Sequence, residues 1–352
     1  MRIAALTTGP TVPSTRVRVR QHLPLLRARG LEIVEYCPPL GGRRFRPPFL
    51  AGVRGRYLAP LFGLELAALL LQRLPGIFGS LRADVTWLER SFVPMLEGAA
   101  FILGRPLVVD IDDAIWLYNP FGRASIGRLI RRADAVIAGN SFLANWCGEY
   151  CRNVHVVPTA VDASKFCPRV FARQVDSKFV VGWTGSSATL SYLEGIESVL
   201  VRFMDRVPNA KLLIVADRAP RFSQIRSEQI LFHKWTPDNE YTLVQDMDVG
   251  IMPLEDSDIA RGKCSFKMLQ YMACGLPVVV SPVGMNGEIL RSETVGFGAQ
   301  NSDEWVESLY TYYRQPELRD KHGRAGRDLV LRKFDLAVVG QQLADIFVRK
   351  IA

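Results

Sequence analysis

Short apolar runs alternate with longer stretches of helical periodicity along almost the whole chain. This alternation is typical of parallel sheets built from β-α-β units, and the runs fall into two series, so we expect two doubly wound α/β domains. The first series is Arg2–Leu6, Leu31–Tyr36, Asp84–Leu88, Leu107–Ile111, Ala135–Ala138 and Val154–Val157. The second series is Phe179–Trp183, Lys211–Ala216, Ile230–Lys234, Val249–Met252, Pro277–Ser281 and Val295–Phe297.

A polar segment, Asp162–Ser177, separates the two series. It contains Pro168 and lacks helical periodicity, as a linker does. We therefore predict one domain over residues 1–170 and a second over residues 171–333. The last stretch, Phe334–Ile351, has apolar residues at helical spacing and predicts a terminal helix. Whether this helix crosses back to the first domain or covers its own domain stays open.

The composition fits this organisation. The chain has 352 residues, of which 48% are hydrophobic and 22% charged, and at about 100 to 200 residues per domain this length suggests two domains. Six scattered cysteines form neither a CxxC pair nor a Cys/His cluster with zinc spacing, so we predict no disulfide framework and no metal site, in a reducing cytoplasm. The apolar run that begins at Met1 is short and predicts a buried strand rather than a signal peptide.

The net charge of +9 belongs to the first half, because residues 1–165 hold 21 Lys and Arg against 12 Asp and Glu, whereas residues 166–352 hold 23 of each. No acid lies between Glu35 and Glu65. Apolar residues follow the basic ones over Leu58–Leu71, a run shorter than the roughly 20 residues that cross a bilayer. The arginines of this segment are Arg43, Arg44, Arg46, Arg54 and Arg56.

Arginines followed by apolar residues favour contact with anionic lipid headgroups, at about 1 kcal/mol for each basic residue. We therefore predict a protein that lies peripherally on an anionic membrane, at the inner face of the plasma membrane. A solvated loop is the alternative interpretation. Nucleic acid is not an expected partner, because aromatic residues are not interleaved with the basic ones in a recognisable module.

Two common nucleotide-binding motifs are missing. The loops after the first strand of each series lack G-x-G-x-x-G, and the chain has no G-x-x-x-x-G-K-[ST]. The sequence thus argues against a dinucleotide-dependent dehydrogenase and against a P-loop NTPase. Ligands of open parallel sheets bind beyond the carboxyl ends of the strands, so the loops there are the candidate site.

The stretch Arg261–Val280 predicts a glycine-containing loop, a helix over Ser265–Cys274, a glycine terminator and a buried strand. Ser265 is expected to cap the helix. Free N–H groups at the helix start, together with Lys263 and Lys267, would attract an anion such as a diphosphate. The alternative is that both lysines are solvated on a surface helix.

Within this stretch, YMACGLPVVVSPVG resembles the donor-site motif of family 4 glycosyltransferases, which are retaining enzymes of the GT-B fold. VVPTAVD is similar to the family's interdomain junction, VGWTGS to the first strand and loop of its C-terminal domain, and ILFHKWTPDNEYTLVQDMDVGIMPL to its base-binding region. RVRVRQHLPLLRARG and DIDDAIW resemble a subgroup that makes bacterial polysaccharides. The resemblance implies two Rossmann-like domains facing across a cleft, with the acceptor on the N-terminal side and the nucleotide sugar on the C-terminal side.

The resemblance also implies an activity and a site. A sugar would move from a nucleotide-diphosphate sugar to a hydroxyl of a lipid-linked or saccharide acceptor, in surface polysaccharide or glycolipid synthesis, with no metal or cofactor. Basic groups would stabilise the leaving diphosphate in place of a metal. The implied donor-binding residues are Gly9, Arg16, Gly185, Ser186, Trp235, Ser265, Phe266 and Gln270, and the implied catalytic residues are Asp112, Lys263 and Lys267.

Asp112 is supported by its position as well. Asp110, Asp112 and Asp113 end a predicted strand, and pleat alternation puts the first two on one face. The family often has a histidine at the position of Asp112, which is therefore expected to orient the acceptor or the donor sugar and to accept a proton. The alternative is that these acids cap the next helix or pair with arginines.

The helix departs from the family pattern at two positions. The family carries two glutamates eight positions apart, the first on the donor sugar and the second on the ribose, and Gly262 and Gln270 stand at these positions. An amide can still bond hydroxyl groups, but glycine offers only backbone. A non-catalytic scaffold that binds sugar nucleotides for another transferase is thus an alternative function, and a sugar-nucleotide epimerase a third.

Overall fold

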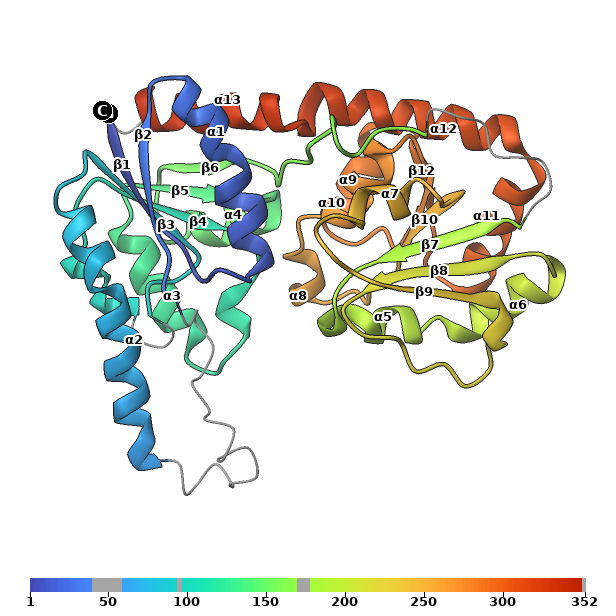
Figure 1. Ribbon diagram of the computed structural model, residues 1–352, viewed down its shortest axis with the longest axis horizontal. Helices are drawn as coiled ribbons and strands as arrows, with labels where there is room; N and C mark the ends of the chain where they lie inside the picture. The colour runs from blue at the N-terminus through green and yellow to red at the C-terminus, as the bar shows by residue number, and fades with distance from the viewer. Residues whose placement is uncertain (40–58, 94–96, 170–177, 350–352) are drawn as a thin grey trace. The chain divides into compact units, whose positions relative to one another are not determined.

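The computed structural model describes residues 1–39, 59–93, 97–169 and 178–349. Two six-stranded parallel sheets organise these residues, with strand orders β2-β1-β3-β4-β5-β6 and β12-β11-β10-β7-β8-β9 (Figure 1). The predicted α/β class with two doubly wound parallel sheets is confirmed. Every predicted strand forms within one residue of its expected ends, because a strand covered on both faces needs an unbroken apolar run.

The strands of the first sheet are β1 (Arg2–Leu6), β2 (Glu32–Tyr36), β3 (Val85–Glu89), β4 (Leu107–Ile111), β5 (Ala135–Ala138) and β6 (Val154–Val156). Its helices are α1 (Leu23–Ala28), α2 (Ala59–Ser80), α3 (Gly122–Arg132) and α4 (Ser141–Gly148). Shorter turns include the π-helical η1 (Thr15–Val19) and the 3-10 helices η5 (Glu97–Ile102) and η6 (Ile115–Leu117).

The strands of the second sheet are β7 (Val180–Thr184), β8 (Lys211–Ala216), β9 (Ile230–Lys234), β10 (Val249–Met252), β11 (Val278–Val280) and β12 (Gly296–Gly298). Its helices are α5 (Leu190–Glu194), α6 (Glu197–Arg206), α7 (Glu240–Val244), α8 (Asp258–Arg261), α9 (Phe266–Ala273), α10 (Met285–Ser292), α11 (Ser302–Arg314) and α12 (Pro316–Leu329). The chain then continues through a π-helical turn at Val330–Phe334 into α13 (Leu336–Arg349).

The backbone contacts divide the chain into two compact units, Met1–Thr159 with Val339–Ala352, and Ala160–Val338. Val161 belongs to the second unit because it bridges to Asp335. Arg327 strengthens this attachment by donating to the carbonyl of Phe166 at 2.7 Å. These contacts place the division before the expected boundary at residue 170, which lies outside the described residues.

The terminal helix α13 begins two residues after its expected start. From Val339 onward it groups with the first unit. The Phe347 ring lies 5.1 Å from the Trp87 ring of β3, centroid to centroid. Gly340 lets the helix approach α1 closely, because a Cβ there would lie 2.7 Å from a methyl carbon of Leu25. The last helix in the sequence is thus part of the first unit's core.

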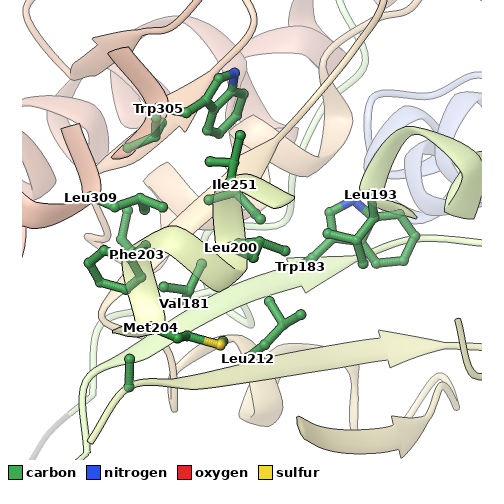
Figure 2. Close-up of a cluster of buried hydrophobic side chains, with 14 of the residues drawn as sticks. Val181, Trp183, Leu193, Leu200, Phe203, Met204, Leu212, Ile251, Trp305 and Leu309 are labelled. Carbon is green, nitrogen blue, oxygen red and sulfur yellow. The ribbon is translucent and has the colours of Figure 1, made fainter. Parts of the chain in front are cut away.

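The core of the second unit forms between β7 and the helices that cover it (Figure 2). Val181 and Trp183 of β7 point toward Leu200 and Phe203 of α6, and all four are buried. Trp305 of α11 completes the cluster from the same side of the sheet. Burial of side chains of this size contributes about 1.5 to 3 kcal/mol each, so this face anchors the strand whose end leads into the candidate site.

Candidate functional site

The loop after β7 and the start of α9 meet at one side chain, Lys267. Its Nζ donates to the Thr189 hydroxyl at 3.1 Å and lies 4.7 Å from the centre of the Trp183 ring. Both partners are electrically neutral, so the cation–π contact and the hydroxyl hold the ammonium without cancelling its charge. These contacts bring the residues near positions 185 and 267 together. This closeness is expected, because both segments lie beyond the ends of strands in the same sheet.

Gly185 is required by this packing. A Cβ at residue 185 would lie 2.4 Å from the buried ring of Trp183 and 2.9 Å from Cε of Lys267. Its N–H donates to the carbonyl of Val215 in β8 at 3.0 Å, which continues the sheet by one residue. Ser186, next in the chain, is exposed and its carbonyl accepts from the Thr189 N–H at 2.9 Å. Two of the predicted donor-binding residues thus form the loop that faces Lys267.

Lys263 and Lys267 are both half-buried at the beginning of α9. Burial, together with the neighbouring Lys263 ammonium, lowers the pKa of Lys267 to about 7. Two like charges are close here, and no described residue forms an ion pair with Lys267. An incoming anion would supply Lys267 with the opposite charge that it does not receive from the described residues. The geometry favours the interpretation of these lysines as an anion site over that of a solvated surface.

Ser265 does not cap α9 with its side chain, contrary to the sequence-based prediction. Its backbone is left-handed, with φ of 51°, and no capping hydrogen bond forms. Its hydroxyl donates instead to Oδ1 of Asn286 at 2.6 Å, and the Asn286 amide donates to the carbonyl of Ser281. The helix begins at Phe266, a half-buried residue, one position later than expected. Ser265 therefore ties α9 to α10 and leaves the first N–H groups of α9 without a side-chain cap.

Gln270 lies one turn further along α9 and is buried. Its amide nitrogen donates to Oε1 of Glu240 at 2.6 Å, and Glu240, the first residue of α7, is buried as well. No motif in the sequence indicates Glu240 as a site residue. A carboxylate is thus present beside the position where the family pattern has one, but it comes from a different helix.

Trp235 follows β9 and is half-buried, with its N–H bonded to the carbonyl of Ala216 at 2.9 Å. Beside it, at the end of β8, Asp217 accepts from the N–H and the hydroxyl of Ser187. These hydrogen bonds, of which that from the hydroxyl is the strongest influence, lower the pKa of Asp217. Asp217, which follows the neighbouring strand β8, therefore holds the loop after β7 in place. No sequence motif indicates this role.

Three acids upstream of α9, Glu255, Asp256 and Asp258, are candidates to replace the missing carboxylate at Gly262, and two of them pair with an arginine. Asp256 accepts from Arg261 at 2.8 Å and Asp258 accepts from the same guanidinium at 3.4 Å. Both acids are exposed on the surface. In this structure the charges of Asp256 and Asp258 are thus balanced by Arg261.

In the first unit, Glu89 organises the loop after β1. This buried carboxylate ends β3 and accepts from the Thr8 N–H at 2.8 Å, from the Thr15 hydroxyl at 2.6 Å and from the Ser14 hydroxyl. The loop contains the buried Gly9 and leads into η1, where Arg16 is half-buried. Gly9 and Arg16 thus lie in the loop and the turn that follow β1.

The acids after β4 pair with arginines. Asp110 is buried against Arg18, whose Nη2 lies 2.9 Å from Oδ1, and burial raises the pKa of this carboxyl to about 6. Asp112 forms an ion pair with Arg90, whose guanidinium also lies 3.7 Å from Asp113. The structure thus contains the pairing with arginines that was the alternative interpretation of Asp110, Asp112 and Asp113.

A shallow hollow of about 380 Å³ lies in the same unit. Its lining residues are Trp116, Leu117, Tyr118, Asn119, Pro120 and Arg123. The hydroxyl of Tyr118 donates to Asp113, and the Trp116 ring stacks on that of Trp146 at 3.8 Å. The hollow thus adjoins the acids that follow β4.

The predicted lipid-binding arginines, Arg43, Arg44, Arg46, Arg54 and Arg56, lie outside the described residues. Among the residues that the structure does describe, no helix has both the length and the apolar character to cross a membrane.

Comparison with protein families matches both units. The model described as Glycosyltransferase Family 4 matches residues 16–165, and that described as Glycosyl transferases group 1 matches residues 178–315. No curated protein matches the chain in sequence.

Solved structures share the fold across the whole chain. Sucrose-phosphate synthase from Thermosynechococcus elongatus is 15% identical, with a TM-score of 0.73 and 98% of each chain covered. Alr3699/HepE from Anabaena, solved with UDP and glucose, is 16% identical, with a TM-score of 0.70 over 99% of this chain and 100% of its own. TarM from S. aureus is 11% identical, with a TM-score of 0.58 over 81% of this chain and 59% of its own. Since two family models match most of both units and these likenesses show the same fold, the chain belongs to the family 4 glycosyltransferases of the GT-B class.

Proposed function

We propose that this chain transfers a sugar from a nucleotide-diphosphate sugar to a hydroxyl acceptor. The observation that carries the proposal is Lys267 in the first turn of α9, which neutral contacts hold against the loop after β7, with Lys263 nearby. A diphosphate gains negative charge as the bond to the sugar breaks. Preorganised cations and uncapped N–H groups stabilise such charge where it develops.

Transfer in this proposal needs no metal and retains the anomeric configuration. The lysines and the helix start supply the positive charge that a divalent cation would otherwise bring to the diphosphate. Retention follows from membership of the family whose donor motif the chain carries. Proton NMR of the product tests it, because the anomeric coupling constant distinguishes the two configurations, and a chelator added to the assay tests the need for a metal.

Trp235 and the Gln270–Glu240 pair form the proposed nucleoside side of the site. Trp235 offers an amphipathic ring to a base at the end of β9. Glu240, oriented by the Gln270 amide, offers a carboxylate to a ribose hydroxyl from α7. The solved complexes of Alr3699/HepE with UDP-glucose and of TarM with UDP lend support, because these proteins of the same fold bind such ligands.

The acceptor side of the proposal rests on the first unit. Asp112 would orient the acceptor hydroxyl or the donor sugar, with Arg90 holding the carboxylate in place. A saccharide would find aromatic and amide groups in the hollow around Tyr118 and Asn119. The arginine-rich segment before α2 supports a lipid-linked acceptor at the inner face of an anionic membrane, and thus a place in surface polysaccharide or glycolipid synthesis.

A panel of UDP, GDP, dTDP and CMP sugars tests the function directly. We expect one of them to release its nucleotide when membrane extract is supplied as acceptor, and Lys263→Ala to reduce that release strongly without lowering the melting temperature. Release of nucleotide from none of the sugars, with one of them still bound, would favour the second candidate, a sugar-nucleotide-binding scaffold. The replacement of both family glutamates by Gly262 and Gln270 is the observation that keeps this candidate in view.

A further inference from the structure

Two cysteines from distant parts of the sequence of the second unit lie close together. Cys167 belongs to the segment that precedes β7, and Cys274 directly follows the last residue of α9. Both are free thiols, and Cys274 is buried whereas Cys167 is half-buried. The proposed sugar transfer uses neither of them.

Contacts on both sides of this pair hold the two segments together. One residue before each cysteine, the carbonyls of Phe166 and Ala273 accept hydrogen bonds from the same nitrogen, Nη1 of Arg327, the first of them at 2.7 Å. One residue after each cysteine, Pro168 packs on Gly275, where an added Cβ would lie 3.6 Å from Cβ of Pro168. The two cysteines thus lie between two points at which their segments meet.

The electrostatics of the pair agree with this closeness. Burial raises the pKa of the Cys274 thiol, and the nearby sulfur of Cys167 raises it further. Disulfides join cysteines whose Cα atoms are about 4.4 to 6.8 Å apart. Segments that meet one residue before and one residue after the pair bring the two thiols within reach of such a bridge.

The two thiols differ in their access to solvent. The Gln245 amide, at the end of α7, donates to the carbonyl of Cys167 at 2.8 Å and to its sulfur at 3.5 Å. This cysteine is nevertheless half-buried rather than buried. A dissolved reagent therefore reaches Cys167 first, and Cys274 can react only from inside the protein.

A hollow of about 210 Å³ opens beside the pair. Its lining residues are Pro168, Gly275, Asp320, Arg324, Arg327 and Asp328. The first two are the direct neighbours of the two cysteines, so a small molecule in the hollow is next to the pair. Charged side chains of both signs suit a reagent with both an ammonium group and carboxylates, as glutathione disulfide has.

We propose that Cys167 and Cys274 form a reversible disulfide on exposure to a low-molecular-weight disulfide. The Cys167 thiolate attacks one sulfur of the reagent, which forms a mixed disulfide and releases one thiol. The Cys274 sulfur, after losing its proton to solvent, displaces the second thiol and closes the bridge. The protein loses two electrons and two protons, and the reagent is reduced to two thiols.

A bridge of this kind is a switch rather than a structural framework, because transient disulfides in reducing compartments are redox-sensing or catalytic. It would tie the end of α9 to the segment before β7. The helix carries Lys267 in its first turn, so the bridge would restrain the element that holds the proposed anion site. Formation of the bridge itself does not depend on sugar transfer.

Peptide mapping tests the proposal in the full-length protein. The protein is incubated with glutathione disulfide, its remaining thiols are alkylated, and it is cleaved with trypsin without reduction. We expect the peptide Phe166–Arg169 to be joined to Met268–Arg291, since each contains a single cysteine. Dithiothreitol should separate the two peptides again.

Three variants sharpen the test. Cys167→Ser should lose the joined peptides, whereas Cys274→Ala should retain glutathione on Cys167 as a trapped mixed disulfide. Cys151→Ser, which removes another half-buried thiol, is the matched control and should form the bridge as the unmodified protein does. Circular dichroism melting checks that each variant folds.

Two results would overturn the proposal. One is a stable mixed disulfide on Cys167 in the unmodified protein without joined peptides, because the two thiols then do not meet. The other is joining of other cysteines only, within or between molecules. Hydrogen exchange tests the consequence: amides of α9 should exchange more slowly after oxidation of the unmodified protein, and not in Cys167→Ser treated in the same way. Neither readout requires turnover, so a protein without transferase activity could still show the bridge.

Discussion

The carboxyl edges of the two sheets differ in how their charges are balanced. At the first edge the acids have partners within the protein: Asp110 pairs with Arg18, and Asp112 with Arg90. At the second edge Lys267 contacts a hydroxyl and an aromatic ring and lies near a second lysine. Asp110 and Asp112 at the first edge are thus paired with arginines, whereas Lys267 at the second edge forms no ion pair among the described residues, and an anion would neutralise its charge. The unpaired charge of Lys267 thus distinguishes the proposed donor site from the edge proposed to bind the acceptor.

Removing Arg18 should have the largest effect on stability. Arg18→Met leaves the buried carboxylate of Asp110 without its cation, which costs about 3 to 5 kcal/mol in comparable cases. The variant's free energy of unfolding, measured in urea, should recover most of this loss when Asp110→Leu is added, because the uncompensated charge is then gone. A loss that persists in the double variant would show that Arg18 acts mainly through its bond to the Val157 carbonyl.

The Arg18→Met effect should also depend on pH. Burial raises the pKa of Asp110 to about 6 from its ordinary 3.8, so the folded state binds more protons between these values and stability falls as pH rises through that window. Without Arg18 the pKa of Asp110 rises further, because the nearby positive charge that lowers it is gone. The variant should therefore lose most stability above pH 6 and less at pH 5, where the carboxyl is largely protonated.

Removing Lys267 should have the largest effect on activity. Lys267→Met keeps the aliphatic stem over Trp183 but deletes the charge, and we expect turnover to fall by about 10²- to 10³-fold, as when a single electrostatic donor is lost. The melting temperature should change little, because the ammonium is desolvated and contacts no acid among the described residues. Lys333→Ala, an exposed lysine of the same unit, serves as control. Full turnover in Lys267→Met would remove this side chain from the site.

Gly185→Ala should cost about 1 to 3 kcal/mol of stability, because its Cβ would overlap the buried Trp183 ring and force it to shift. Donor affinity should fall in the same variant, because Lys267 packs against both residue 185 and the Trp183 ring. Gly148→Ala is the matched control: that residue ends α4 and has no atom within 4 Å of an added Cβ. Equal melting temperatures of the two variants would mean that the loop after β7 can shift to accommodate the added methyl group without loss of stability.

A smaller effect is expected from pH on the unmodified protein. The pKa of Lys267 is about 7 when folded and 10.5 ordinarily, so the unfolded state binds more protons in between and this side chain makes stability rise with pH over that window. Donor affinity should change in the opposite sense, weakening above pH 7 as the ammonium loses its proton. Calorimetric titration with a nucleoside diphosphate at several pH values measures this affinity. Lys267→Arg should make the affinity nearly independent of pH, because arginine keeps its charge. A flat profile in the unmodified protein would contradict the assignment.

Parts of the site follow from local sequence and parts do not. The closeness of Gly185 and Lys267 could be expected, because parallel strands deliver the segments that follow them to one edge of the sheet. Glu240 could not, since nothing in α7 indicates that its carboxylate would meet Gln270 of another helix. The ion pair of Asp112 with Arg90 could not be predicted either, because Arg90 follows a different strand, β3. Ser265 looked like a cap by residue type, but Asn286 from the next helix takes its hydroxyl.

The sequence by itself determined the twelve strands and their grouping into two parallel sheets, because doubly covered strands demand apolar runs that are visible in one dimension. It also determined the charge imbalance between the halves. The tertiary structure alone decided which charges meet, where α13 packs and which face of α2 stays open to solvent. These outcomes depend on contacts between residues far apart in the chain, and a helix apolar on both sides carries no local mark of the side that another element will cover.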